Sequence, residues 1–134
     1  MTTLKEFLRE LPPEARDTFC ELYEGDLLPR TALRDEVLSY LRLVQSMAET
    51  NRAINDEMAE AVAKRLVSML KKTGKDAPEF DRRVLQAACR YFCLEGDGED
   101  DLDSEEGFDD DCDVMNAVAE HLGRPELMID LFAL

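Results

Sequence analysis

Apolar side chains recur every three or four residues along most of the chain, the spacing of one face of an α-helix. The two clearest runs begin near Thr31 and near Asn55 or Asp56, residue types that can cap a helix start. No segment shows the two-residue alternation of a half-buried strand. The expected inward positions are Leu33, Val37, Tyr40, Leu41, Val44 and Met47 in the first run, and Met58, Ala59, Val62, Ala63, Leu66, Met69 and Leu70 in the second.

Turn-forming and capping residues delimit two helices before Thr31. Thr3 and Glu6 fit a capping box, which predicts a short helix from Leu4 to Leu11. The Pro12-Pro13 pair that follows ends this helix and opens the next one, because proline is tolerated in a first helical turn. Gly25 is then expected just past the end of the second helix.

Three further helices are predicted in the second half of the chain. One begins at Ala77-Pro78 and stops near Leu94, and another is opened by Asp110 or Asp111 and ends at Gly123. A short final helix opens at Pro125. The apolar positions are Val84, Ala87, Ala88, Tyr91 and Phe92, then Val114, Val118 and Leu122, then Leu127, Met128 and Leu131.

These elements predict an all-α fold, a compact bundle of five to seven helices. The 134 residues suit one domain, 1–134, and the apolar fraction of 45% is enough for one core. One connection departs from the pattern of short loops. Residues 95–109 contain three glycines and little periodicity, so they predict a long loop before the penultimate helix. A structureless loop of this length is uncommon in a compact domain and is usually functional or disordered.

The negative charge of the chain is concentrated in one segment. The net charge is −15, and residues 95–113 contain twelve aspartates and glutamates but no lysine or arginine. Without these twelve, 19 acidic residues face 16 basic ones, a nearly balanced remainder. Such charge disfavours direct binding to nucleic-acid phosphates or to an anionic membrane, and it favours a basic or cationic partner.

The chain carries no sign of a membrane span or an export signal. It has no apolar run of roughly 20 residues, and its first residues lack the basic and apolar regions of a signal peptide. We therefore expect a cytoplasmic protein with reduced cysteines. The cysteines are Cys20, Cys89, Cys93 and Cys112.

The thiols and the single histidine give little support for metal or catalytic chemistry. Cys89, Cys93, Cys112 and His121 supply the ligand types of a zinc site, but the usual closely spaced loop pair is missing. Nothing in the sequence places a thiol beside His121 to form a nucleophile and base, and no glycine-rich phosphate loop is present. The chain is accordingly expected not to be an enzyme. His121 is expected in the last turn of its helix, where an imidazole suits the helix dipole.

The aspartates around the predicted helix start allow several interpretations. Calcium and magnesium prefer oxygen ligands, so Asp109, Asp111 and Asp113 could hold one of them with upstream loop carboxylates. An EF-hand does not fit, because a loop starting at Asp97 puts Leu102 at position six and Phe108 at position twelve. Asp110 or Asp111 could instead cap the helix, with Phe108 as a hydrophobic staple. A solvated acidic loop without a ligand is the third interpretation.

The stretch from about residue 84 to 123 resembles the YkvA-like family, small bacterial helical proteins of unknown function. The resemblance rests on Tyr91-Phe92 at the end of a helix, an acidic loop, and Gly107-Phe108-Asp109-Asp110 before the next helix. The family's proline-bearing segment after Tyr-Phe is replaced here by residues 95–102. This departure argues against transferring the membrane association of some relatives, and the family implies no reaction or cofactor.

The leading interpretation is a non-catalytic interaction module that presents a carboxylate-rich loop to a basic protein surface. An inhibitor or a regulator would be such a module. A divalent-metal-binding helical domain is the alternative. Six basic residues, Lys71, Lys72, Lys75, Arg82, Arg83 and Arg90, form one neighbourhood that could pair with the loop within or between chains. The expected partner-binding residues are Asp97, Glu99, Asp100, Asp101, Asp103, Glu105 and Glu106.

Overall fold

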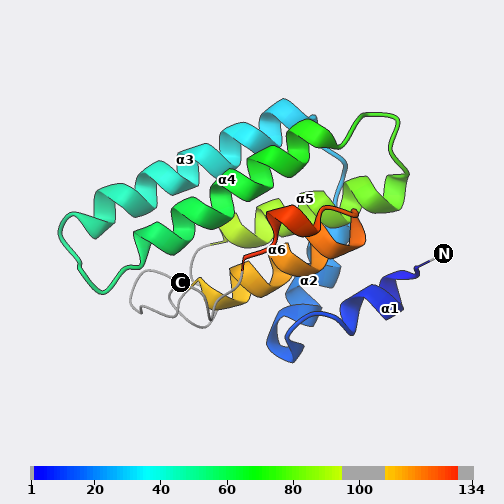
Figure 1. The fold of residues 1–134 in the computed structure, drawn as a ribbon, viewed down its shortest axis with the longest axis horizontal. Helices are drawn as coiled ribbons and strands as arrows, with labels where there is room; N and C mark the ends of the chain where they lie inside the picture. Colours follow the sequence, from blue (N-terminus) through cyan, green and yellow to red (C-terminus); the bar gives the residue numbers. More distant parts are fainter. Residues whose placement is uncertain (1, 95–107, 130–134) are drawn as a thin grey trace.

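The computed structural model describes residues 2–94 and 108–129, and within these ranges every regular element is a helix. The predicted all-α bundle is therefore confirmed. In the described part of the chain, six α-helices and two short 3₁₀ turns follow one another (Figure 1). They are α1 (Leu4–Leu8), η1 (Pro13–Ala15), α2 (Arg16–Tyr23), α3 (Arg30–Ala48), α4 (Asp56–Lys72), α5 (Glu79–Cys93), α6 (Asp109–His121) and η2 (Pro125–Leu127).

Helix α5 is the centre of the bundle, since it packs against α2, α3, α4 and α6. Figure 1 shows α3 and α4 side by side along one face, with α5 and α6 beneath them. All five predicted apolar positions of α5 are buried, as are three neighbours that the pattern did not include, Leu85, Gln86 and Cys89. A helix covered on several sides buries more than one stripe, which explains the additional residues.

Helix α4 follows the sequence pattern closely. Its start is capped by Asn55, whose side-chain oxygen accepts a hydrogen bond from the backbone N–H of Met58 at 3.1 Å. Lys71 and Lys72 lie in the last turn, where positive charge stabilises the helix dipole. The seven predicted inward residues, from Met58 to Leu70, are all buried.

Helix α3 differs from the prediction at its start and in the exposure of one residue near its end. It begins at Arg30 directly after Pro29, so Thr31 lies inside the helix and the predicted cap at Thr31 is wrong. Proline fixes an extended backbone before the first turn and replaces the side-chain cap. Met47 continues the apolar spacing but is 37% exposed, because the last turns of α3 extend past α5 (Figure 1). The other predicted inward residues of α3 are buried.

The first and last helical elements of the described residues are shorter than predicted. Thr3 caps α1 by accepting from the N–H of Glu6 at 3.2 Å, but the helix ends at Leu8 rather than Leu11. Where the final helix was predicted, residues 125–129 form only the 3₁₀ turn η2, and the predicted inward residue Leu131 lies outside the described residues. Beyond η2, the side-chain amide of Asn116 forms two hydrogen bonds with the backbone of Ile129, at 2.8 and 2.7 Å. Asn116 therefore ties the segment after η2 to α6.

None of the helices in residues 2–94 and 108–129 has the length and apolar character that a bilayer crossing requires.

Candidate functional site at the start of α6

Aromatic contacts fix where α6 begins. Phe108 occupies the N-cap position and is fully buried, and its ring centroid lies 6.0 Å from that of Phe92 on α5. Phe92 in turn contacts Tyr40 of α3 edge-on, with centroids 5.2 Å apart. Phe108, predicted as a staple within its own helix start, thus packs on a neighbouring helix. The start of α6 is held against α5, and α5 in turn against α3.

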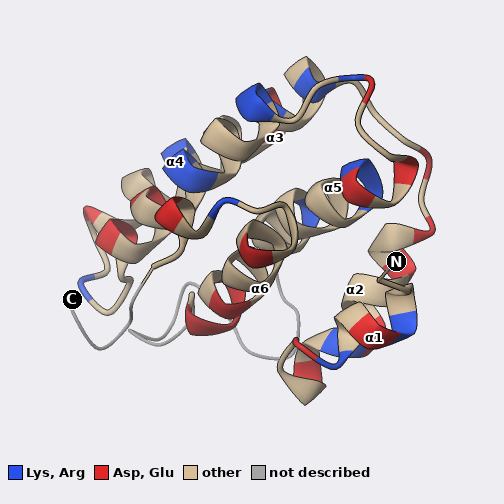
Figure 2. Cartoon of the chain, turned by 45° about the vertical axis from the view of Figure 1, so that its right-hand side comes forward, with Lys and Arg blue, Asp and Glu red and all other residues tan. Residues whose placement is uncertain are grey.

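The first turn of α6 consists of three carboxylates. Asp109, Asp110 and Asp111 lie there, and Figure 2 shows the acidic colour at this end of the helix. Because α6 begins at Asp109, the prediction that Asp110 or Asp111 is the N-cap residue is wrong. The negative charges still face the positive end of the helix dipole, which stabilises them. The predicted acidic loop, 95–109, lies outside the described residues except for Phe108 and Asp109.

The three aspartates proposed as metal ligands do not share a face. With 3.6 residues per turn, Asp109 and Asp113 are neighbours one turn apart, whereas Asp111 points away from both. Asp111 is only 4% exposed, and the other two are half-buried. Within the two described ranges, no three His, Cys, Asp or Glu side chains come together as a metal site. Helix α6 therefore does not assemble the predicted ligand set from its own residues.

The pKa of Asp113 reflects the negative charge of this region. Burial raises the pKa of its carboxyl group, and the negative charges of Asp109 and Glu14 raise it further. Glu14 belongs to η1, far away in the sequence, so two separate elements contribute carboxylates to one place. Their mutual repulsion makes ionised Asp113 less favourable than an isolated aspartate. Sequence periodicity gave no sign of Glu14, because its position depends on how η1 packs.

The thiols near this region are chemically quiet. Burial raises the pKa of Cys112 to about 12, the carboxylates of Asp113 and Asp109 add to this, and Arg65 opposes it. Burial likewise raises the pKa of Cys93 to about 12, and it raises the pKa of Cys89 as well. A thiol that stays protonated is a poor nucleophile and a poor metal ligand. These cysteines act as small apolar side chains of the core.

His121 lies in the last turn of α6, as predicted. Its Nε2 atom is 2.7 Å from a carboxylate oxygen of Asp81 on α5. The imidazole also packs edge-on against the rings of Phe7 and Phe80, with centroids 5.7 and 5.1 Å apart. His121 thus joins α1, α5 and α6, and Asp81 is a partner that the sequence did not reveal.

The predicted basic neighbourhood is divided among several local contacts. Three of its six members each lie within 4.0 Å of a glutamate outside residues 95–113. Two others, Lys75 and Arg82, line a cavity beside α5. The pairs are Lys72–Glu126 at 3.8 Å, Arg83–Glu79 at 3.8 Å and Arg90–Glu36 at 4.0 Å.

The residues predicted to bind a partner, Asp97, Glu99, Asp100, Asp101, Asp103, Glu105 and Glu106, lie outside the described residues. What the structure describes is the helix start that follows them in the chain. It offers several carboxylates at the positive end of a helix, next to Glu14 and anchored by buried aromatic rings. This arrangement suits the binding of positive charge and offers no activated nucleophile.

Comparisons with models of protein families, with curated proteins and with solved structures give no significant match to this chain. The resemblance of residues 84–123 to the YkvA-like family stays a prediction.

Proposed function

We propose that this protein is a non-catalytic cytoplasmic interaction module that binds a basic surface of another protein through residues 95–113. The observation that carries the proposal is the charge of this segment, twelve carboxylates in nineteen residues with no lysine or arginine. Charge at this density repels itself and makes the chain less stable unless it meets positive charge. An inhibitor that occupies a nucleic-acid-binding surface by imitating its charge is one form of such a module.

The start of α6 supports the proposal from within the bundle. The contact between Phe108 and Phe92 holds the first turn of α6, and so its carboxylates, in a fixed position. The raised pKa of Asp113 is partly due to Asp109 and Glu14, so these like charges oppose one another in the isolated chain. A cationic group docked here would lower that repulsion. Binding then gains energy both from the new contacts and from relief of the old repulsion.

Several arginines of the chain hold contacts within the bundle, which favours a partner outside the chain. Arg83 donates to the backbone carbonyls of Tyr23 and Gly25 at 3.0 and 2.8 Å. Arg16 donates to the carbonyl of Leu8 at 2.9 Å. These contacts hold guanidinium groups at connections between helices, where they stabilise the fold.

Charge-matched variants test the proposal. One variant changes the seven predicted partner-binding carboxylates to their amides, and a control variant does the same at seven exposed carboxylates elsewhere. Both carry seven fewer negative charges, so they differ only in where the charge is lost. The control positions are Glu10, Asp17, Glu21, Glu24, Asp35, Glu49 and Asp76.

Each form is immobilised and the basic proteins recovered from a cell extract are quantified. We expect wild type and control to recover the same partner, and the segment variant to recover at least about tenfold less. Raising the salt from about 0.05 to about 0.5 M should release the partner, because the screening length falls severalfold. Equal recovery by wild type and the segment variant would overturn the proposal.

A further inference from the structure

A cavity of about 300 Å³ lies beside the first half of α5, away from the start of α6. Its walls come from residues 27–29, the start of α3, the end of α4 and the connection between α4 and α5. This volume is at the lower end of the range for small-molecule pockets. Five leucines form the apolar part of the wall, and three of them are buried. They are Leu27, Leu28, Leu33, Leu70 and Leu85.

A buried amide keeps this cavity in shape. Gln86 is 2% exposed, and its side-chain oxygen accepts a hydrogen bond from the N–H of Leu28 at 2.7 Å. Its side-chain nitrogen donates to the carbonyl of Asp26 at 2.6 Å. The amide thus pairs with the connecting segment much as a neighbouring strand would. Because both bonds are satisfied by protein groups, the wall formed by residues 27–29 is fixed before any ligand arrives.

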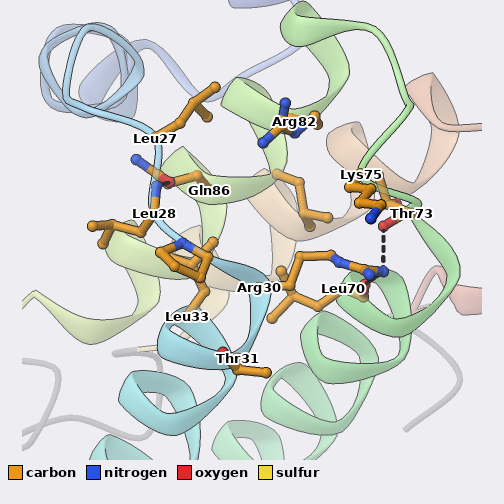
Figure 3. A pocket seen from close by; sticks show the side chains of 12 residues that line it. Leu27, Leu28, Arg30, Thr31, Leu33, Leu70, Thr73, Lys75, Arg82 and Gln86 are labelled. Carbon is orange, nitrogen blue, oxygen red and sulfur yellow. Dashed lines mark hydrogen bonds between the residues drawn. The ribbon is translucent and has the colours of Figure 1, made fainter.

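Positive charge surrounds the same cavity. Figure 3 shows Arg30, Lys75 and Arg82 on one side of the opening, facing Leu27, Leu28 and Leu33 on the other. Arg30 reaches from α3 to the end of α4, where one of its nitrogens donates to the carbonyl of Thr73 at 2.9 Å and that of Leu70 at 3.3 Å. Its remaining guanidinium donors are available to a ligand.

The side chains of Lys75 and Arg82 have no ion pair or hydrogen bond with any residue in 2–94 or 108–129. The adjoining first turn of α3 contains no acidic residue. Three cationic side chains around one cavity are notable in a chain of net charge −15. Together they form a local cluster of positive charge at the opening of the cavity.

We propose that this cavity binds a small anionic amphiphile, a carboxylate carried on a short apolar body. The carboxylate accepts hydrogen bonds from Lys75 and Arg82, and the apolar body lies against the leucines. Charge-assisted hydrogen bonds supply orientation, and burial of the apolar body supplies most of the affinity. A polyanion does not fit the same site, because the net negative charge of the molecule repels it beyond the cavity.

Octanoate is a suitable probe, compared with octanol, which has the same tail without charge, and with acetate and inorganic phosphate, which have charge without a tail. Binding is followed by NMR through the backbone amide of Leu28 and the side-chain amide of Gln86. We expect octanoate to bind with a dissociation constant between about 0.1 and 1 mM. Octanol, acetate and phosphate should each bind at least about tenfold more weakly.

Substitutions locate the site. Lys75→Gln and Arg82→Gln should each weaken octanoate binding at least about fivefold. The matched control is Lys64→Gln, which removes the same charge from the exposed pair with Glu60 on α4 and should leave the affinity unchanged. Far-UV circular dichroism verifies that each variant is folded.

Three results would overturn the proposal. Octanol binding as well as octanoate would show an apolar cavity without charge selectivity. Phosphate binding as well as octanoate would show an anion site in which the leucines have no part. Absence of shifts at Leu28 and Gln86 at about 10 mM octanoate, about tenfold above the weakest affinity expected, would show that the cavity takes no such ligand.

Discussion

Two regions of opposite charge adjoin α5 and are built by different means. Near its C-terminal end, Phe92 holds the acidic start of α6. In its middle, Gln86 holds a connection that, with Arg82, borders a basic cavity. The acidic region is anchored by aromatic rings, and burial and its like charges raise the pKa of Asp113. At the basic cavity, buried hydrogen bonds and apolar side chains fix the wall.

This difference teaches how one small bundle keeps two charged regions apart. Carboxylates collect at the start of α6, where the helix dipole stabilises them. Some arginines donate to backbone carbonyls at helix ends and connections, as Arg30 does at the end of α4. The repulsion at the acidic end is partly balanced by the dipole and is relieved further by an outside cation.

The largest effect is expected from breaking the anchor of the acidic region. Phe92→Ala removes a fully buried ring that contacts both Phe108 and Tyr40. The loss of a large core side chain should lower the free energy of unfolding by about 3–5 kcal/mol. Chemical denaturation monitored by circular dichroism measures it. Leu43→Ala, at a position 41% exposed, is the control and should cost less than about 0.5 kcal/mol. A loss below about 1 kcal/mol for Phe92→Ala would contradict the anchor.

A smaller loss of stability is expected from a substitution at the basic cavity. Gln86→Leu leaves the N–H of Leu28 and the carbonyl of Asp26 without their amide partner. Unsatisfied buried groups of this kind cost about 1–3 kcal/mol each, so we expect a loss of about 2 kcal/mol after partial hydration. Hydrogen exchange at Leu28 should also accelerate. Gln45→Leu on α3 serves as control, and equal destabilisation by the two variants would show that the amide pairing has no special role.

A gain in stability is expected where like charges meet. Burial and the neighbouring carboxylates raise the pKa of Asp113 in the folded chain, so ionising it costs more there than in the unfolded chain. This penalty is absent below the ordinary aspartate pKa, grows as the pH rises through the raised pKa, and is then constant. Asp113→Asn should therefore stabilise the protein near neutral pH, by less than about 1 kcal/mol because water screens a half-exposed group.

The pH dependence of the stability distinguishes relief of charge repulsion from an effect of the substitution that does not depend on charge. Near pH 3 the stabilisation by Asp113→Asn should vanish, because the wild-type carboxyl is then protonated in both states. Asp76→Asn, at an exposed position in the connection between α4 and α5, is the control. Thermal unfolding at both pH values measures the difference. A stabilisation of the same size at low pH would show that charge repulsion is not its cause.

The sequence predicted the interior of the helices far better than their ends. All seven inward residues of α4 were found from spacing alone, and its cap, Asn55, was one of the two residues predicted to start it, Asn55 or Asp56. The predicted cap of α6, Asp110 or Asp111, lies two or three residues after the observed N-cap, Phe108. Asp109, Asp111 and Asp113 were grouped because they lie within five residues of the sequence, although Asp111 is buried on another side of the helix. Periodicity fixes a face but not the first residue.

Contacts between residues far apart in the sequence could not be predicted from the sequence. The charge of Glu14 acts on Asp113 only because the fold brings η1 towards α6, and Asp81 meets His121 only in the folded bundle. Gln86 did leave a signal, a lone amide between Leu85 and Ala87 on an apolar helix. A polar side chain at such a position needs hydrogen-bond partners when buried. Its partners, however, follow from the path of residues 26–28.

The most direct test of the central claim is an NMR titration of the isotopically labelled protein with a short basic peptide of lysine and arginine. The account predicts changes in the carboxyl signals of residues 95–113 and Glu14, with the pKa of Asp113 falling as the peptide neutralises its surroundings. These changes should disappear at about 0.5 M salt. Shifts spread evenly over exposed carboxylates such as Asp35 and Glu60, with the pKa of Asp113 unmoved, would contradict it.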